Sequence, residues 1–312
     1  MEEKVLYSME SPFQQEINVK GYYFGKNEGK EHSACIVGAL RGNEYQQLYI
    51  CSKLIDVLKK IEKHGDIVGE NGILVIPSVS NMSMDFGKRF WISDDTDLNR
   101  LFPGNPSGES GSRVAYAIME TTKGYRYGIH LPSFYLGGTF MPHIRLLDPE
   151  HGSTSLANLF GLPYVIEAKS RPFDRTTLHN NWQRNGTEAF SLYTGMTGKI
   201  DDELAAQAVS SILRFLTRMG IIRYYSHSGY IASVLKEGDL EPIMTEAAGI
   251  FIKKAECGQE VSRGDVLAQI MKADSGEIIS EVKAPTDGII FYAETRPVVY
   301  SNLLVTQSLW IV

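Results

Sequence analysis

The residues with the clearest potential for chemistry form one short run, Asp95-Thr96-Asp97-Leu98-Asn99-Arg100-Leu101-Phe102-Pro103-Gly104. An Asn amide and an Arg guanidinium side by side supply planar donors that match the oxygens of a carboxylate. Asn99 and Arg100 are therefore candidate substrate-binding residues. The alternative is a structural loop in which Asp97 and Arg100 pair with each other or with neighbours. The composition of the run leaves both interpretations open.

Arg41 and Glu44 form a second candidate group, within Gly38-Ala39-Leu40-Arg41-Gly42-Asn43-Glu44. The Glu44 carboxylate could bind a metal ion or form an ion pair with an arginine. A guanidinium stays protonated and has no lone pair, so Arg41 cannot be a metal ligand and would repel a dication. We expect Arg41 to be an anchor for a carboxylate ligand, or else the ion-pair partner of Glu44.

A histidine, His130, lies in the apolar segment Gly128-Ile129-His130-Leu131. A neutral imidazole is a common metal ligand, but a lone histidine beside apolar residues is more often a satisfied buried group. Catalytic zinc normally takes three protein ligands and a water. Glu44 and His130 would thus be an incomplete set, and His143 is the nearest further candidate in the sequence.

These side chains need elements that bring them together, and the chain from about residue 33 to 220 alternates strand-like and helical runs. That pattern favours an α/β fold with a largely parallel or mixed sheet. The apolar periods predict two helices, over residues 48–61 and 202–219, which end near Gly65 and Gly220. The best strand candidates are residues 34–37, 73–77, 164–167 and 189–193.

After Tyr225 the residue pattern changes to short strand-like segments separated by glycine and proline. We predict an α/β domain over residues 1–228 and a C-terminal β domain over 229–312. The second domain resembles the barrel-sandwich fold of biotinyl and lipoyl carriers. Its Lys272 lacks the preceding acidic residue of a carrier motif, so we expect a structural or site-capping domain.

Taken together, these segments resemble the succinylglutamate desuccinylase/aspartoacylase family, a branch of the zinc-carboxypeptidase-like hydrolases. The resemblance implies a carboxypeptidase-like α/β domain for residues 1–228. The run from Asp97 to Gly104 is similar to the family's D-L-N-R-x-F-P-G stretch. The resemblance implies zinc held at the positions of Arg41, Glu44 and His130, and a carboxylate held by Asn99 and Arg100. Arg89 is similar to the arginine that polarises the scissile carbonyl in the family.

Two positions depart from the family pattern. Arg41 stands where the zinc-binding histidine of G-x-H-G-N/D-E belongs, and Tyr193 stands where the general base, a glutamate, is expected. An unperturbed phenol has a pKa near 10 and is a poor base at neutral pH. We expect Arg89, Arg100, Arg145 and Arg41 to line one positively charged cleft suited to a small carboxylate.

Three hypotheses follow. The first is a zinc-dependent, metallopeptidase-like hydrolase that deacylates small N-acyl amino-acid-like carboxylates, with zinc as the cofactor expected from the family. The second is a catalytically degenerate, metal-free protein, a pseudoenzyme, that binds a carboxylate in the same cleft. The third and weakest is metal-free catalysis by Tyr193, His130 and the arginines.

Composition narrows the partners. A net charge of -6 without a long basic stretch argues against nucleic acid, and no apolar run approaches the roughly 20 residues of a membrane helix. Cysteines at 35, 51 and 257 have no disulfide or CxxC spacing. The N-terminus lacks the apolar core of a signal peptide, so we expect a cytoplasmic protein. A homo-oligomer stays open.

Overall fold

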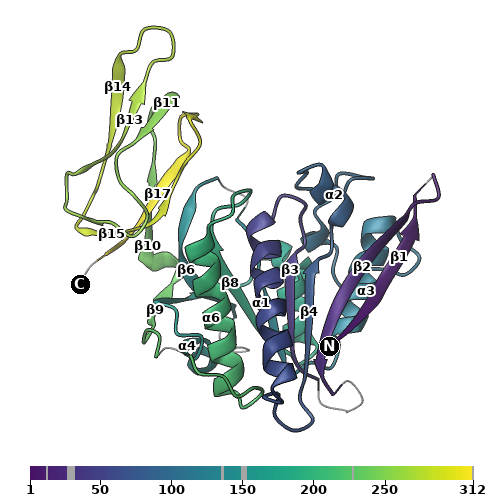
Figure 1. Ribbon diagram of the computed structural model, residues 1–312. Coiled ribbons are helices and arrows are strands. Elements are labelled where there is room, and N and C mark those ends of the chain that lie inside the picture. Colours follow the sequence, from purple (N-terminus) through teal and green to yellow (C-terminus); the bar gives the residue numbers. More distant parts are fainter. Residues whose placement is uncertain (12, 27–31, 135–136, 149–152, 227, 311–312) are drawn as a thin grey trace. The chain divides into compact units, whose positions relative to one another are not determined.

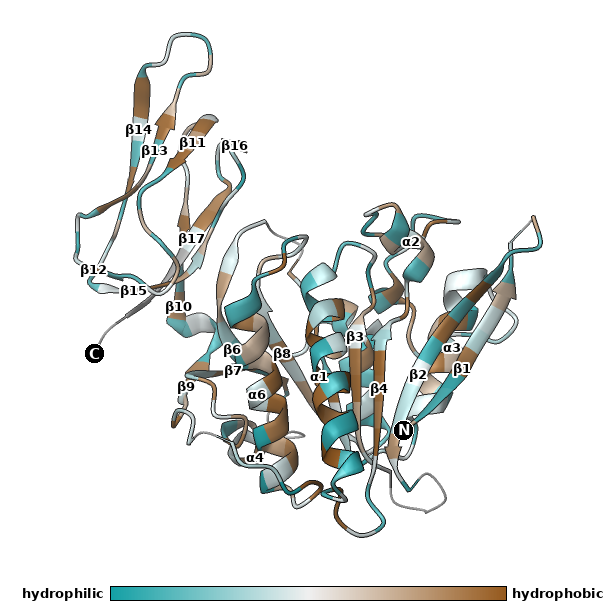
Figure 2. Ribbon diagram, in the orientation of Figure 1, coloured by the Kyte–Doolittle hydropathy of each residue, from teal (hydrophilic) through white to brown (hydrophobic). Residues whose placement is uncertain are grey.

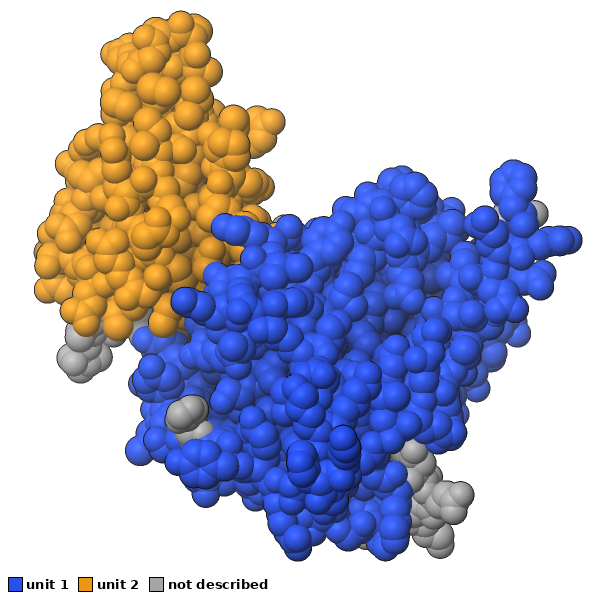
Figure 3. Space-filling model, viewed as in Figure 1, with its two compact units in different colours: residues 1–133, 142–193, 198–234 blue, residues 134–141, 194–197, 235–312 orange. Residues whose placement is uncertain are grey.

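A mixed sheet with helices on both faces forms the larger part of the fold (Figure 1). The computed structural model describes residues 1–11, 13–26, 32–134, 137–148, 153–226 and 228–310. The chain divides into two units (Figure 3). Unit 1 contains residues 1–133, 142–193 and 198–234, and unit 2 contains residues 134–141, 194–197 and 235–312.

The strands of unit 1 follow the order β1-β2-β4-β3-β5-β8-β6, and β7 pairs with β6. Strand β3 is parallel to β4 and β5, and β5 is parallel to β8, whereas β1, β2 and β4 pair antiparallel. Their bounds are β1 Glu2–Glu10, β2 Glu16–Gly25, β3 His32–Ala39, β4 Gly72–Ser78, β5 Tyr127–His130, β6 Thr139–Leu147, β7 Tyr164–Ala168, β8 Glu188–Gly195 and β9 Ser233–Lys236.

Helices cover both faces of this sheet. Side chains of α1 and α6 share one apolar cluster with one face of the strands, and side chains of α3 and α5 share a second cluster with the other face. The helices are α1 Tyr45–Lys63, α2 Asn81–Asp85, α3 Ser110–Thr122, α4 Thr154–Asn158, α5 Leu178–Arg184 and α6 Asp202–Arg218, and the 3-10 turns are η1 Leu98–Arg100 and η2 Pro172–Thr176.

The two-residue period of the strands assigns their side chains to the two clusters. In β3, Ala34 and Ile36 face α1 and α6, while Cys35 and Val37 face the α3 and α5 side. Figure 2 accordingly colours β3 and β4 as largely hydrophobic, whereas α1 alternates hydrophobic and hydrophilic residues. A strand buried on both faces needs such a continuous apolar run.

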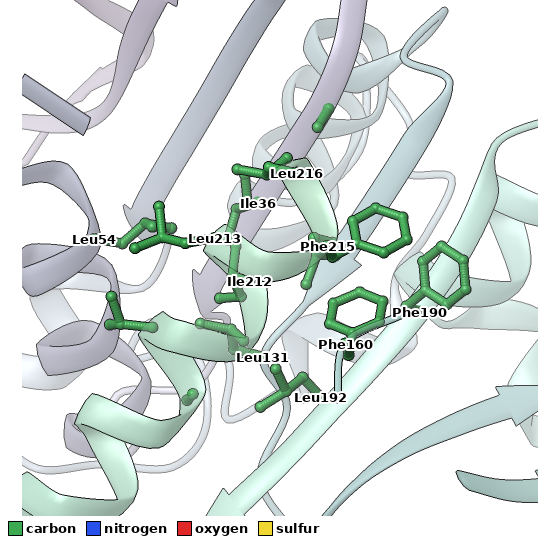
Figure 4. Packing of buried hydrophobic residues seen from close by; sticks show 14 of the residues in the cluster. Ile36, Leu54, Leu131, Phe160, Phe190, Leu192, Ile212, Leu213, Phe215 and Leu216 are labelled. Atoms are coloured by element: carbon green, nitrogen blue, oxygen red, sulfur yellow. The ribbon is translucent and has the colours of Figure 1, made fainter. Parts of the chain in front are cut away.

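The cluster beneath α1 and α6 is anchored by aromatic rings (Figure 4). Phe215 of α6 stacks on Phe160 with ring centroids 4.3 Å apart, and Phe190 of β8 lies 5.2 Å from both. Burying rings of this size contributes several kcal/mol, about 25 cal/mol for each Å² of apolar surface removed from water. This packing fixes the face of β8 that points away from the polar side chains described below.

Unit 2 is built from short antiparallel strands around its own apolar cluster. One sheet has the order β14-β13-β11-β16. Strand β15 pairs with β12 and with β17, and β17 also pairs with β10. Lys272 lies in the turn that joins β13 to β14. The elements are η3 Glu237–Asp239, β10 Leu240–Met244, β11 Gly249–Lys253, β12 Glu260–Val261, β13 Val266–Met271, β14 Ile278–Lys283, β15 Gly288–Ala293, β16 Val298–Val299 and β17 Leu304–Trp310.

The predicted α/β fold with a mixed sheet, flanking helices and a C-terminal β part is confirmed. Each of the predicted strands lies within β3, β4, β7 or β8, and the two predicted helices correspond to α1 and α6. The division at residue 228/229, the carboxypeptidase-like label and the barrel-sandwich label stay predictions. Among the helices of the described residues, none combines the length and hydropathy that a membrane crossing requires.

Candidate functional site

Four of the predicted site residues, Arg41, Glu44, His130 and Tyr193, lie at or near the carboxyl ends of β3, β5 and β8, whereas Arg145 lies on β6. Arg41 and Glu44 lie between the end of β3 and the start of α1, and His130 is the last residue of β5. In the sheet register, His130 lies between Val37 of β3 and Ser191 of β8. Because these strands are parallel neighbours, their carboxyl ends meet at one edge, where ligand sites of α/β sheets usually lie.

A buried ion cluster occupies this edge. The Arg41 guanidinium donates from Nη1 to Glu44 Oε1 at 3.1 Å, and from Nε and Nη2 to the two Asp97 oxygens at 3.0 and 2.9 Å. Arg41 is only 4% exposed. Burial works against its charged form, but Glu44 and Asp97 outweigh burial and raise the pKa of Arg41. A bidentate pair of this kind is the strong form of an Arg–carboxylate bond.

The Glu44 carboxylate is fully engaged by the protein. Its Oε2 accepts from the backbone N–H groups of Leu40 and Arg41, each at 2.9 Å. Its Oε1 accepts from the N–H of Ser133 at 3.1 Å and from the Ser133 hydroxyl at 2.6 Å, in addition to the Arg41 bond. A carboxylate offers about four lone-pair sites. The ion pair of Glu44 with Arg41, one of the two alternatives from the sequence, is therefore present.

These residues do not fit a zinc site of the family type. The guanidinium of Arg41 stands in a ligand position without a lone pair, and the acceptor capacity of Glu44 is used by N–H and O–H donors. Within the described parts of the chain, no group of three or more His, Cys, Asp and Glu side chains could hold a metal ion. His143, considered as a third ligand, instead stacks on the Tyr193 ring with centroids 5.1 Å apart.

A second polar cluster, of neutral groups, lies on the α5 side of the sheet. His179 of α5 and Ser191 of β8 share a hydrogen bond of 2.8 Å between Nδ1 and Oγ. Burial, assisted by the charge of Arg145 and opposed by that of Asp148, lowers the pKa of His179 to about 3. Burial, then Arg41 and His179, hold the pKa of His130 well below its usual value. Both imidazoles are therefore neutral at physiological pH.

Tyr193 follows Ser191 on β8, and the charges of Arg41 and Glu44 act on it. Burial raises the pKa of its phenol, against the opposing charges of Arg145 and Arg41, while the carboxylates of Glu44 and Asp174 act in the same direction as burial. The phenol thus stays protonated at neutral pH. It can donate a hydrogen bond, but its basic phenolate form is even less populated at neutral pH than that of an exposed tyrosine.

The Asp97–Arg100 turn is held by its own side chains. Asp97 caps η1, because its Oδ1 accepts from the N–H of Asn99 at 3.1 Å. The Oδ1 of Asn99 accepts from the N–H of Leu178 at 3.1 Å, which attaches this turn to the start of α5. Arg100 stacks on Phe173 with its guanidinium carbon 5.0 Å from the ring centroid, and lies 3.7 Å from Asp174.

Carboxylates offset the charge of the predicted arginine cleft. Arg89 lies 4.0 Å from Asp97, and burial followed by the charge of Arg41 lowers the pKa of Arg89. Arg100 faces Asp174. Arg145 is half-buried and acts electrostatically on Tyr193 and His179. Side chains of both signs therefore lie around the predicted arginines, and of these acids Asp174 was not part of the sequence interpretation. The positively charged cleft itself stays a prediction.

Sequence reasoning missed several residues of this site. Ser133 holds Glu44, and His179 and Ser191 pair with each other. Asp174 and Asp148 act on Tyr193 and His179. Ser191 lies within the predicted strand 189–193 and Ser133 follows closely after Leu131, but no spacing pattern marks these residues as part of a site. Only the strand register, which places Ser191 beside His130, provides a signal.

The fold and the site define a mixed α/β protein with its polar residues at the strand carboxyl ends, and comparison with known proteins gives the family. A model of the succinylglutamate desuccinylase/aspartoacylase catalytic domain matches residues 30–219, so the chain belongs to this family. The family resemblance predicted from the sequence is thereby confirmed.

Individual relatives are distant. N-alpha-acetyl-L-2,4-diaminobutyric acid deacetylase from Halomonas elongata is 23% identical over 291 residues, which cover 84% of this chain and 77% of the relative. A succinylglutamate desuccinylase from a Silicibacter species has a TM-score of 0.80 at 18% identity, over 96% of this chain and 91% of that one. The product-bound ectoine utilization protein EutE from Ruegeria pomeroyi has a TM-score of 0.79 at 18% identity, over 96% and 92%.

Proposed function

We propose that the protein is a deacylase-type hydrolase whose cleft takes a small N-acyl amino acid. The observation that carries the proposal is the Asp97–Arg100 turn, held in place at the strand carboxyl ends by the bonds between Asp97 and Arg41. The family supports the reaction class, and the N-acetylated amino acid in the name of the Halomonas relative supports the substrate class.

The roles proposed for individual residues follow their surroundings. Arg100, 38% exposed in its side chain, and Arg145 would hold the ligand's carboxylate, with the Asn99 amide beside them. Arg89 would donate to the carbonyl oxygen as negative charge develops there. Tyr193, protonated at neutral pH, would be a hydrogen-bond donor to the ligand rather than the general base.

A second function is a metal-free binding protein that does not cleave its ligand. The specific observation in its favour is the engagement of Glu44, which leaves its oxygens no acceptor capacity for zinc. Zinc-dependent hydrolysis, expected from the family, would require Glu44 to exchange these bonds for metal coordination, so no zinc step follows from the residues as they lie. In either function the partner is a small carboxylate, and a cytoplasmic location and a homo-oligomer stay predictions.

The test is a titration of the purified protein with N-alpha-acetyl-2,4-diaminobutyrate and with N-succinylglutamate, followed by calorimetry and by detection of released amine. We expect one of them to bind, and the variant Arg100→Ala to bind about 10–100-fold more weakly, the effect of losing a charged hydrogen bond. Arg263→Ala, an exposed arginine of unit 2, is the control and should bind as the unchanged protein does.

The released amine separates the two functions. Release by the unchanged protein supports the hydrolase, whereas binding without release supports the metal-free binding protein. Binding of neither compound, or equal binding by Arg100→Ala and Arg263→Ala, would contradict the carboxylate site.

A further inference from the structure

Arg41 joins two loops that are far apart in the sequence. It lies in the loop after β3, and its bidentate partner Asp97 lies 56 residues further along the chain. Glu44, on the same loop as Arg41, accepts from the remaining guanidinium nitrogen. A single buried cation therefore contacts a carboxylate from each loop, which is the arrangement in which a multivalent cation would otherwise hold two loops together.

The connection continues beyond Asp97. Asp97 caps the η1 turn through the N–H of Asn99, and Asn99 in turn accepts from the first residue of α5. Helix α5 carries His179, which bonds to Ser191 of β8. The position of the turn that carries Asn99 and Arg100 thus depends on the bonds that Arg41 makes.

The chemistry of the donors and acceptors separates this arrangement from a metal site. Every bond to Glu44 comes from an N–H or O–H group, two of them from the backbone of the loop itself and two from Ser133. The loop is folded around the carboxylate as an anion receptor, and the guanidinium completes it. Arg41 brings one positive charge that neither a chelator nor a change of pH within the stable range can remove.

We infer that Arg41 is a positioning residue which takes the place of a metal ion: it is a covalently attached cation that assembles the Asp97–Arg100 turn against the loop after β3. The site is then complete without zinc. The part of this inference that concerns ligand affinity rests on the proposed function, whereas metal content and unfolding temperature do not depend on it.

The first measurement is the metal content and the unfolding temperature of the full-length protein, before and after dialysis against a chelator and after addition of zinc. We expect less than one tenth of an equivalent of zinc, on the order of the background of a protein without a site, and an unfolding temperature that changes by less than about 1 °C. About one tightly held zinc per chain, together with a lower unfolding temperature after chelation, would overturn the inference.

The second measurement compares variants of Arg41. Arg41→Met removes the cation and leaves Glu44 and Asp97 without it, so we expect the unfolding temperature to fall by on the order of 10 °C. Arg41→Lys should recover only part of this loss, because an ammonium cannot donate to both Asp97 oxygens in a planar pair. Arg113→Met, at an exposed arginine of α3, is the matched control and should unfold like the unchanged protein.

Charge and packing are separated by neutralising the partners. If Arg41 acts as a cation, the triple change Arg41→Met, Glu44→Gln and Asp97→Asn should be more stable than Arg41→Met alone, because it no longer buries unpaired charge. Equal stability of Arg41→Met and Arg113→Met would overturn the inference. If Arg41→Met does not fold, the Arg41→Lys variant and the metal measurement still test the inference.

A positioning role also predicts a change in binding. The affinity for N-alpha-acetyl-2,4-diaminobutyrate should be unaffected by the chelator, at least 10-fold weaker in Arg41→Met, and partly restored in Arg41→Lys. If the compound binds only after zinc is added, the inference is wrong. If it does not bind at all while the metal and stability results hold, the proposed function fails and the role of Arg41 in assembling the site stands.

Discussion

Two polar clusters lie at the same edge of the sheet, and they differ in how the unfavourable free energy of burying polar groups is offset. The cluster of Arg41, Glu44 and Asp97 keeps its charges and pairs each of them. The cluster of His130, His179 and Ser191 removes charge, because burial lowers the pKa of both histidines. The carboxylates stay charged because backbone and side-chain donors surround them. The histidines lack such partners for a charged form and are neutral.

The two clusters also have different structural roles. The charged cluster joins loops and depends on every partner being present, since Arg41 and Glu44 are buried, Asp97 is partly buried, and each has an opposite charge beside it. The neutral cluster joins α5 to β8 by one hydrogen bond. Variants in the first cluster should therefore be more damaging than variants in the second, and the clusters should respond differently to acid.

The largest effect is expected from Glu44→Ala. It removes the acceptor of the Leu40, Arg41 and Ser133 donors and leaves them buried, so the free energy of unfolding should fall by about 3–5 kcal/mol. Urea denaturation measures it. Glu70→Ala, which removes an exposed pair with Lys26, is the control and should change stability by no more than about 1 kcal/mol. Equal effects of the two changes would mean that the charged cluster is not stabilising.

Acid should weaken the neutral cluster first. The pKa of His179 is about 3 in the folded protein and about 6.5 in an unfolded chain. Between these values the unfolded state binds a proton that the folded state does not, so stability is highest above about pH 6.5 and falls as the pH decreases towards 3. His179 alone should contribute a slope of up to about 1.4 kcal/mol per pH unit, or about 2–3 kcal/mol by pH 4.5.

Urea denaturation at several pH values between 4.5 and 7.5 reads this slope. It should be flatter by up to about 1.4 kcal/mol per pH unit in His179→Gln, and unchanged in His64→Gln, an exposed histidine of the loop after α1. Asp97 contributes to the pH dependence of stability in a different pH range. Burial works to raise its pKa, but Arg41 outweighs burial and lowers it, so its contribution is present above about pH 4 and lost only as the pH falls below that value. A slope that His179→Gln does not alter would show that the imidazole titrates in the folded state as it does in the unfolded chain.

A smaller loss is expected from Ser191→Ala, which removes the hydrogen-bond partner of His179 Nδ1 and leaves that atom buried. The free energy of unfolding should fall by about 1–2 kcal/mol. Ser52→Ala provides the comparison, since the Ser52 hydroxyl donates to a backbone carbonyl on the exposed face of α1 and its loss should cost less than about 0.5 kcal/mol. If both variants lose the same small amount, the His179–Ser191 bond contributes nothing to stability.

The smallest effect concerns the helix that carries His179. Thr177 caps α5, because its Oγ1 accepts from the N–H of Asn180 at 3.3 Å. Thr177→Ala should lower the free energy of unfolding by about 1 kcal/mol, and Thr177→Ser should retain most of the cap. Thermal unfolding of the pair is the measurement. No difference between alanine and serine would show that the cap does not position the helix.

The sequence predicted the framework better than the contacts within the site. Apolar periodicity was enough for β3, β4, α1 and α6, because burial on one or both faces leaves a regular pattern. The ion pair of Arg41 and Glu44 was one of two alternatives, since residues three positions apart at a loop-helix junction can meet. The engagement of Glu44 by backbone N–H groups could not be predicted, because main-chain donors leave no trace in the residue types.

Long-range partners were the other gap. His179 was not recognised, because nothing in the residues around it distinguishes a site histidine from a helix histidine. The contacts of Asp97 with Arg41 and of Asp174 with Arg100 were not predicted either, because they depend on where η1 and η2 are placed in space. Such contacts follow from tertiary packing rather than from local spacing.

The alternation of side chains along β8 has a consequence for how this protein can change over time. Phe190 and Leu192 pack in the aromatic core, while Ser191 and Tyr193 lie on the polar side of the strand. Inserting or deleting a single residue in β8 would exchange the two sets, so rings would enter the polar cluster and polar groups would enter the core. Variation in this strand should therefore proceed by replacement at constant length, and new specificities should arise one side chain at a time.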